Sequence, residues 1–168
     1  MATVTGKGQP MNTLGKLPEV GSKAPDFQLT RIDFSDVSIK DFKGKKILMN
    51  IFPSIDTSTC ATSVRKFNEK AANLEDTVVL CISKDLPHAQ KRFCGAEGID
   101  NVIPLSDFRS GNFGKTYEVE FTDTPIKGLL SRSVVVVDRE GKVIYTEQVA
   151  DTSNEPDYNA ALQALSNG

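Results

Sequence analysis

The amino-acid sequence predicts an α/β protein in which helices flank a mixed central β-sheet. Two apolar runs, ILMNIF at 47–52 and TVVLCIS at 77–83, are typical of buried strands. Between them, apolar side chains recur at helical spacing from Val64 to Leu74. Strands that alternate with helical segments in this way indicate helices packed in layers on a sheet.

The N-terminal part of the chain predicts smaller elements. The first twenty residues include Gly6 and Pro10, which favour either a hairpin around TGKGQP or an ordered arm. The segments DFQLT at 26–30 and DVSIKDF at 36–42 alternate apolar and polar residues, as short strands do. These two strands are expected to join the sheet.

The region after the second apolar run predicts a helix and a further strand. LPHAQKRFCGAEG begins a helix at Pro87 and ends it at Gly95 or Gly98. NVIPLSD at 101–107 predicts a strand, and Pro104 favours a place for that strand at the edge of the sheet.

The C-terminal part predicts a hairpin and a closing helix. RSVVVVD at 132–138 and VIYTEQV at 143–149 are expected to pair through a turn at Glu140-Gly141, and EPDYNAALQAL at 155–165 has helical periodicity. The whole chain, 1–168, is expected to form one domain, because a chain of this length buries about 70% of its unfolded surface without disulfides. The order of elements is similar to a thioredoxin-like core, although the periodicity fits other small α/β folds as well.

Composition argues against several classes of partner. Lys and Arg number 20, Asp and Glu 22, and no run of five like charges occurs, so nucleic acid is not an expected partner. No segment approaches the roughly 20 apolar residues that span a bilayer. The first twenty residues contain no apolar run of the kind found in secretory signals, so we expect a cytoplasmic protein with no membrane association.

The three cysteines, Cys60, Cys81 and Cys94, favour thiol chemistry over a structural disulfide framework, because their number is odd and the expected compartment is reducing. Cys60 is expected at the start of a helix, after the small residues PSIDTST, which should leave its sulfur reachable. A thiol of pKa near 8.5 is about 3% ionised at pH 7, whereas one of pKa near 6 is about 90% ionised. A helix N-terminus supplies only about 0.3–1 kcal/mol toward such a change, so another donor or cation is needed.

Two residues are candidates for that donor. Thr57 lies three residues before Cys60, where its hydroxyl is expected either to reach the sulfur or to cap the helix. Arg132 begins an apolar strand, which is an unusual place for a charged side chain unless it interacts with a specific group such as the Cys60 sulfur. The alternative interpretation of Arg132 is a surface salt bridge. A lone cysteine at a helix start is itself often structural.

The other candidates have simpler interpretations. Cys81 lies in the middle of an apolar strand and is expected to be a core residue. His88, the only histidine, is expected to be exposed, and Phe52 and Phe93 are expected in the core or lining an apolar substrate pocket. The scattered cysteines and single histidine have no metal-ligand spacing, and no glycine-rich loop fits a phosphate, so we expect no metal or cofactor.

The chain resembles the peroxiredoxins at Pro53, Thr57 and Cys60, which match the Pro-x-x-x-Thr/Ser-x-x-Cys signature. The segments NIFPSIDTSTCATSVRKFN, VVLCISKDLPHAQKRFCGAEG and EPDY are similar to the bacterial thiol peroxidase subfamily. This resemblance covers nearly the whole chain and implies a thioredoxin-like fold. It also implies an antioxidant enzyme that reduces hydrogen peroxide and alkyl hydroperoxides.

The resemblance implies a role for each site residue. Cys60 would attack the peroxide and become a sulfenic acid, and Cys94 would then close an intramolecular disulfide with it. Thr57 would hold the peroxide, Pro53 would shield the sulfenic acid, and Arg132 would stabilise the thiolate. Thioredoxin is the expected reductant and a homodimer the expected assembly.

Two other functions are weighed against this one. A thioredoxin-type thiol–disulfide oxidoreductase would need a Cys-x-x-Cys pair, but Ala61, Thr62 and Ser63 follow Cys60. A redox-sensing interaction module would react with peroxide too slowly to protect the cell. A Cys-His hydrolase is disfavoured, because no Asn or Asp is suggested that would orient His88.

Overall fold

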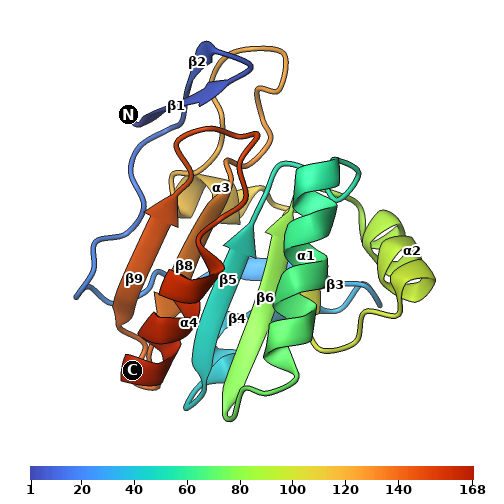
Figure 1. Cartoon of the computed structure of the whole chain (residues 1–168), viewed down its shortest axis with the longest axis vertical. Helices are drawn as coiled ribbons and strands as arrows, with labels where there is room; N and C mark the ends of the chain where they lie inside the picture. Colours follow the sequence, from blue (N-terminus) through green and yellow to red (C-terminus); the bar gives the residue numbers. More distant parts are fainter.

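The computed structural model describes all 168 residues and shows one seven-stranded mixed sheet in the order β4-β3-β7-β6-β5-β8-β9 (Figure 1). β5, β6 and β7 are parallel, and the outer strands pair with them or with each other in antiparallel fashion. β1 and β2 form a separate hairpin. The predicted α/β architecture with a mixed central sheet is therefore confirmed.

The strands are β1 (Thr3–Gly6), β2 (Gln9–Asn12), β3 (Gln28–Arg31), β4 (Asp36–Ser38), β5 (Lys46–Ile51), β6 (Thr77–Ser83), β7 (Ile103–Ser106), β8 (Ser133–Val137) and β9 (Val143–Gln148). The helices are the 3₁₀ helix η1 (Ile39–Phe42) and the α-helices α1 (Ser58–Ala71), α2 (Pro87–Glu97), α3 (Asn112–Thr116) and α4 (Tyr158–Asn167). No helix is both long enough and apolar enough to cross a membrane.

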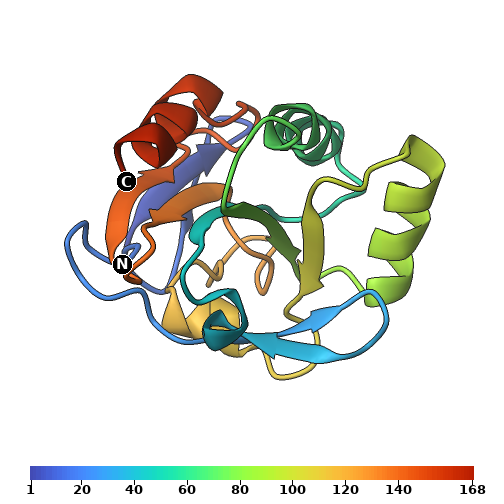
Figure 2. The ribbon, with the colours of Figure 1, turned by 90° about the horizontal axis from the view of Figure 1, so that it is seen from below.

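The sheet separates two apolar cores, and the alternation of side chains along β5 shows how. Ile47 and Met49 pack in the core shared with η1 and α3, whereas Leu48 packs in the core shared with α1, α2 and α4. Figure 2 shows α1 and α4 over one face of the sheet and α3 near the opposite face. A central strand buried on both sides explains the uninterrupted apolar run in the sequence.

The predicted edge position of the 101–107 strand is wrong. β7 lies inside the sheet, between β3 and β6. Within β7, only Leu105 and Ser106 pair with β3, so no β3 residue stands opposite Pro104. The proline is tolerated because β7 is not paired with β3 at Pro104, so the missing N–H leaves no hydrogen bond to β3 unmade.

One other boundary differs from its prediction, and one pair of alternatives is decided. The strand expected at 36–42 ends at Ser38, because the Asp41 carboxylate accepts the Ser38 N–H at 2.8 Å and begins η1. Of the two predicted ends of α2, Gly98 is confirmed: the helix continues through Gly95, and Gly98 caps it in the left-handed conformation with φ 65°. Helix α3 has only five residues, too few for the apolar periodicity on which the prediction of helices depends.

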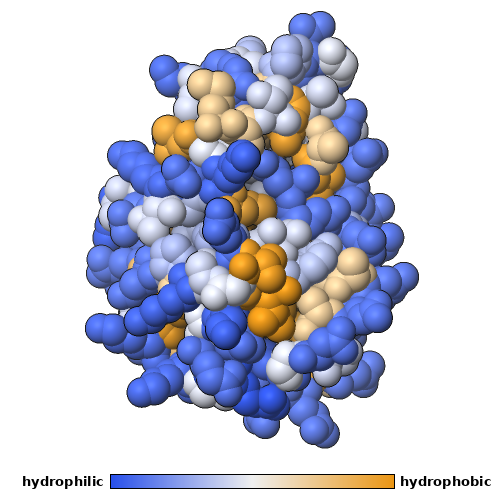
Figure 3. Space-filling model, turned by 90° about the vertical axis from the view of Figure 1, so that its left-hand side faces the viewer, coloured by the Kyte–Doolittle hydropathy of each residue, from blue (hydrophilic) through white to orange (hydrophobic).

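The N-terminal residues form the hairpin, which decides between the two predicted alternatives. Lys7 and Gly8 both have positive φ, 50° and 77°, as a tight two-residue hairpin turn requires. On the side of the molecule that Figure 3 presents, apolar side chains lie in small groups between hydrophilic ones.

Candidate active site around Cys60

Cys60 lies in the first turn of α1, directly after the central strand β5. Thr57 is the N-cap of this helix, and its hydroxyl accepts the Cys60 N–H at 3.2 Å. The capping role expected of Thr57 is therefore confirmed, while its hydroxyl forms no hydrogen bond with the sulfur. The cap fixes the start of α1 and so the position of the Cys60 side chain.

Arg132 approaches Cys60 from the neighbouring strand. It immediately precedes β8, in which Ser133 pairs with Ile51 at the end of β5. The Arg132 Nη1 atom donates to the Cys60 Sγ atom at 3.3 Å. The Nε and Nη2 atoms both donate to the Thr152 carbonyl oxygen, at 3.3 and 3.0 Å. The sheet thus brings together two residues that are 72 positions apart in the chain.

The guanidinium of Arg132 is buried without a carboxylate. Arg132 is 3% exposed and takes part in none of the ion pairs of the structure, so the alternative of a surface salt bridge is wrong. A buried cation without a counter-ion is costly in free energy. A deprotonated Cys60 would supply the missing negative charge, with a charge-assisted hydrogen bond.

The expectation that the Cys60 sulfur is reachable is wrong for this conformation. The residue is 0% exposed and packs in an apolar cluster with Phe52, Ile55 and Val64. The preceding loop keeps Thr57 on the surface but buries Pro53. Small side chains did not open the site, because apolar neighbours on β5 and α1 close around the sulfur.

Cys94 is half-buried on α2 and forms no disulfide with Cys60. It lines a small apolar hollow with Phe52, Val64, Phe93 and Cys81, on which Cys60 has no surface. All three cysteines are reduced, and burial raises the pKa of the Cys94 thiol. A bond between Cys60 and Cys94 therefore requires rearrangement of the helices that carry them.

The interpretations of Cys81 and His88 are confirmed. Cys81 is 2% exposed, and burial raises its pKa to about 12, so its thiol stays protonated at neutral pH. His88 is exposed and its ring lies 5.0 Å from that of Phe34. Phe52 and Phe93 belong to the core and also line the hollow beside Cys94.

Asp85 ties the loop before Cys60 to the segment that precedes α2, and the sequence patterns did not reveal it. Its carboxylate accepts the Ser54 hydroxyl at 2.9 Å, the Ile55 N–H at 2.7 Å and the Ser83 hydroxyl at 2.6 Å. Thr152 was also missed, because it acts through a backbone carbonyl. Neither an aspartate after a strand nor a main-chain oxygen carries a sequence signal.

The contacts between α2 and the Cys60 region are partly buried and partly exposed. Phe93 of α2 packs in the same apolar cluster as Phe52 and Val64. Arg65 and Glu97 pair at 2.6 Å, and Arg92 and Asp56 pair at 3.0 Å. Surface ion pairs contribute about 0–1 kcal/mol each, so the two ion pairs add little to the attachment of α2.

We expect Thr57→Ala to lower the free energy of unfolding by about 1 kcal/mol, because α1 loses its N-terminal cap. Thr57→Ser keeps the hydroxyl and should stay within about 0.5 kcal/mol of the parent. Urea unfolding followed by circular dichroism measures both.

The matched control is Thr62→Ala, a partly exposed position inside α1 whose hydroxyl donates back to the Ser58 carbonyl. An equal loss at Thr62 and Thr57 would contradict the capping role.

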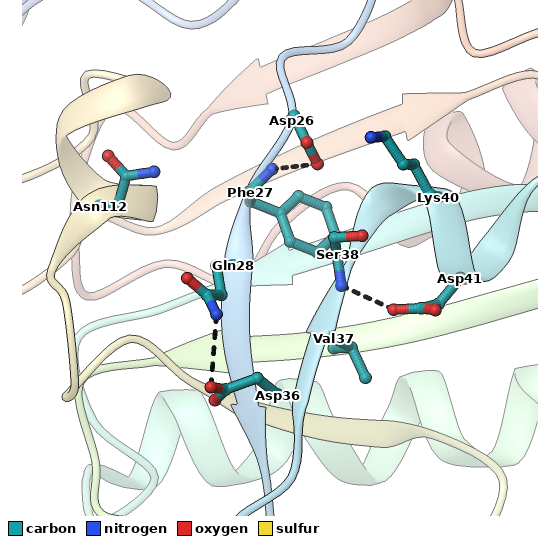
Figure 4. Close-up of a pocket in the computed structure, with 9 residues that line it drawn as sticks. All are labelled: Asp26, Phe27, Gln28, Asp36, Val37, Ser38, Lys40, Asp41 and Asn112. Atoms are coloured by element: carbon teal, nitrogen blue, oxygen red, sulfur yellow. Dashed lines mark hydrogen bonds between the residues drawn. The ribbon is translucent and has the colours of Figure 1, made fainter.

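A wider surface hollow on the opposite face of the sheet does not form part of this site. Figure 4 shows its lining by residues of the β3–β4 region, η1 and α3. Its carboxylates already have partners in the protein: Asp26 accepts the Phe27 N–H, Asp41 accepts the Ser38 N–H, and Asp36 accepts the Gln28 amide. None of the carboxylates of this hollow is therefore without a partner in the protein.

The comparisons with known proteins agree with this fold and site. The family model described as Redoxin matches residues 19–162. The thiol peroxidase of Corynebacterium glutamicum is 56% identical over 98% of this chain and 99% of its own, and that of Mycobacterium tuberculosis is 54% identical over the same shares. A peroxiredoxin-like protein from Aquifex aeolicus, with 36% identity, superposes with a TM-score of 0.93 over 98% of this chain and 96% of its own.

The chain therefore belongs to the redoxin family, and its thioredoxin-like fold with a cysteine at the start of α1 defines it as a peroxiredoxin. The thiol peroxidase of Chromobacterium violaceum, at 24% identity and a TM-score of 0.90, has the same fold. Among the peroxiredoxins, the identities of 54–56% over nearly the whole length place this oxidoreductase with the thiol peroxidases.

Proposed function

We propose that Cys60 is the residue that a hydroperoxide oxidises and that Cys94 resolves the oxidised form within the same chain. One observation carries the first part: the buried Arg132 guanidinium, which has no carboxylate partner, donates to the Cys60 sulfur at 3.3 Å. The thiolate is the nucleophile in such chemistry, and this contact stabilises it.

In the first step, the Cys60 thiolate attacks the terminal oxygen of the hydroperoxide. A sulfur–oxygen bond forms, the oxygen–oxygen bond breaks, and a proton from solvent converts the leaving oxygen to water or an alcohol. The sulfur is oxidised to a sulfenic acid by two electrons. Arg132 stabilises the negative charge that moves from the sulfur to the leaving oxygen. Because the sulfur is buried, the loop at 53–57 has to shift to admit the peroxide.

In the second step, the Cys94 sulfur attacks the sulfenic acid, a disulfide forms, and the oxygen leaves as water. Burial disfavours the Cys94 thiolate in the intact helix, as its raised pKa indicates. Unwinding of α2 removes that burial and brings the two cysteines within bonding range. The exposed ion pairs between α2 and the Cys60 region add little to the cost of this motion, whereas Phe93 has to leave its apolar cluster.

The third step needs an external dithiol, and we propose thioredoxin. A dithiol protein reduces the Cys60–Cys94 disulfide by thiol exchange and becomes a disulfide itself. The alternative in which this chain is the thiol–disulfide oxidoreductase is disfavoured, because Cys60 has no Cys-x-x-Cys partner. A role as a slow redox sensor remains distinguishable by the rate of the peroxide reaction.

Hydrogen peroxide and alkyl hydroperoxides are the proposed substrates. Phe52, Ile55 and Val64 surround Cys60 and offer an apolar wall to an organic group once the loop has moved. Comparison of cumene hydroperoxide with hydrogen peroxide measures this preference directly.

We also propose a homodimer in the cytoplasm. The exposed apolar side chains of Leu86 and Phe34, 53% and 38% exposed, support an interface beside the segment that leads into α2. Sedimentation at micromolar concentration distinguishes the dimer from a monomer.

Intact-mass analysis tests the proposed chemistry. After one equivalent of peroxide, the reduced chain should lose two hydrogens, because the oxygen leaves as water when the disulfide closes. Cys94→Ser should instead gain one oxygen, since its sulfenic acid has no resolving thiol. A mass gain of oxygen in the parent without disulfide would contradict the role of Cys94.

A further inference from the structure

The direction of the Arg132 guanidinium is set by one backbone oxygen. Two of its three nitrogens, Nε and Nη2, donate to the Thr152 carbonyl, and the remaining Nη1 points at the Cys60 sulfur. A displacement of this carbonyl would rotate the planar guanidinium and turn Nη1 away from the sulfur. The segment that holds Thr152 in place is therefore relevant to the chemistry at Cys60.

The N-terminal hairpin is what binds that segment. The Thr5 N–H donates to the Ala150 carbonyl at 2.8 Å, and the Thr152 N–H donates to the Thr5 carbonyl at 2.9 Å. Figure 1 shows β1 near the turn of chain that leads from β9 toward α4. In β1, Thr5 follows the rule of alternating pairs: Gly6 and Gln9 close the turn as a hydrogen-bonded pair, so Thr5 and Pro10 form a non-hydrogen-bonded pair, and both backbone groups of Thr5 point away from β2.

The hairpin is itself anchored on the chain that leads into Arg132. Val4 and Met11 form a buried apolar cluster with Phe121. The Asp123 carboxylate accepts the Asn12 N–H at 2.9 Å and the Asn12 side-chain amide at 2.7 Å. The hairpin thus joins the segment before β8 to the segment after β9, and Arg132 lies between them.

We propose that the hairpin β1–β2 is a positioning element for Arg132: through Thr5 it fixes the Thr152 carbonyl and so aims the guanidinium at Cys60. The proposal rests on the function proposed above for Arg132. The other titratable groups that interact electrostatically with Arg132 are Glu155 and Tyr158, and Glu155 is already paired with Lys66 at 2.9 Å. Within this arrangement, only the Thr152 carbonyl and the sulfur accept hydrogen bonds from the guanidinium.

The test is Thr5→Pro in the full chain, which removes the N–H that binds Ala150. We expect the rate constant for reaction with hydrogen peroxide to fall about tenfold, and the pH profile of Cys60 alkylation by iodoacetamide to move to higher pH. Thr5→Ser keeps both backbone bonds and the hydroxyl, which donates to the Ala150 carbonyl at 3.3 Å, and should react at the parent rate. Thr3→Pro is the matched control, because Thr3 lies in the same strand and makes no contact with residues 150–152.

A double variant separates positioning from a general loss of structure. In an Arg132→Met background, Thr5→Pro should lower the rate no further, since there is no guanidinium left to aim. Additive losses, or a normal rate for Thr5→Pro alone, would overturn the positioning role. If Arg132→Met itself reacts at the parent rate, the proposed function of Arg132 fails and this inference fails with it.

Discussion

Replacement of Cys60 by serine is expected to abolish the reaction with hydroperoxides, because a hydroxyl is almost entirely protonated at neutral pH and a poor nucleophile beside a thiolate. Cys94→Ser should keep the first turnover at nearly the parent rate and lose recycling through the internal disulfide. Cys60→Ser should therefore show no oxidation, whereas Cys94→Ser should be oxidised and stop at the sulfenic acid.

Stopped-flow consumption of hydrogen peroxide and cumene hydroperoxide, with one and with many equivalents, measures both effects. Cys81→Ser is the matched control, since the Cys81 thiol is buried and its pKa is raised to about 12. Its reaction should match the parent in both regimes. Full multiple turnover by Cys94→Ser with thioredoxin would show that Cys94 is not the resolving residue.

The Arg132→Met variant is expected to react with peroxide about a hundredfold more slowly, the scale found when one donor to a developing charge is removed. The loss is expected because the guanidinium no longer donates to the attacking sulfur or stabilises the charge on the leaving oxygen. Stopped-flow consumption of hydrogen peroxide measures it.

Arg132→Lys should recover little of this rate. A single ammonium cannot reproduce the planar set of donors that binds the Thr152 carbonyl and the Cys60 sulfur together. Arg139→Met is the control, because Arg139 is exposed and pairs only with Asp76, at 3.6 Å. A rate within threefold of the parent for Arg132→Met would rule out the proposed role of this guanidinium.

The burial of the Cys60 sulfur marks a limit of prediction from local sequence. The small residues before Cys60 predicted a reachable thiol, yet the residue is 0% exposed. The local sequence shows how large the side chains next to Cys60 in the chain are. It does not show which side chains the fold packs against the sulfur. Here Phe52 from the end of β5 and Val64 one turn along α1 complete the enclosure.

The same limit applies to the edge strand. Pro104 lacks an N–H, which lowers the chance that its strand lies in the middle of a sheet. In β7, however, the residues paired with β3 are Leu105 and Ser106, both of which follow the proline. Where a neighbouring strand stops is a property of the assembled sheet, which no local pattern records.

The sequence by itself determined the α/β class, the central strands, the helix that carries Cys60 in its first turn, and Thr57 as a candidate for its cap. These features depend on apolar periodicity and on interactions within a few residues, which the linear order of side chains contains. Tertiary structure alone decided that Arg132 meets the Cys60 sulfur, that Asp85 holds the loop before it, and that the hairpin at Thr5 binds the Thr152 segment. Each of these contacts joins segments that are far apart in the chain. Several of them use a backbone carbonyl or N–H, and because nearly every residue carries the same two groups, the sequence does not mark which residue makes the contact.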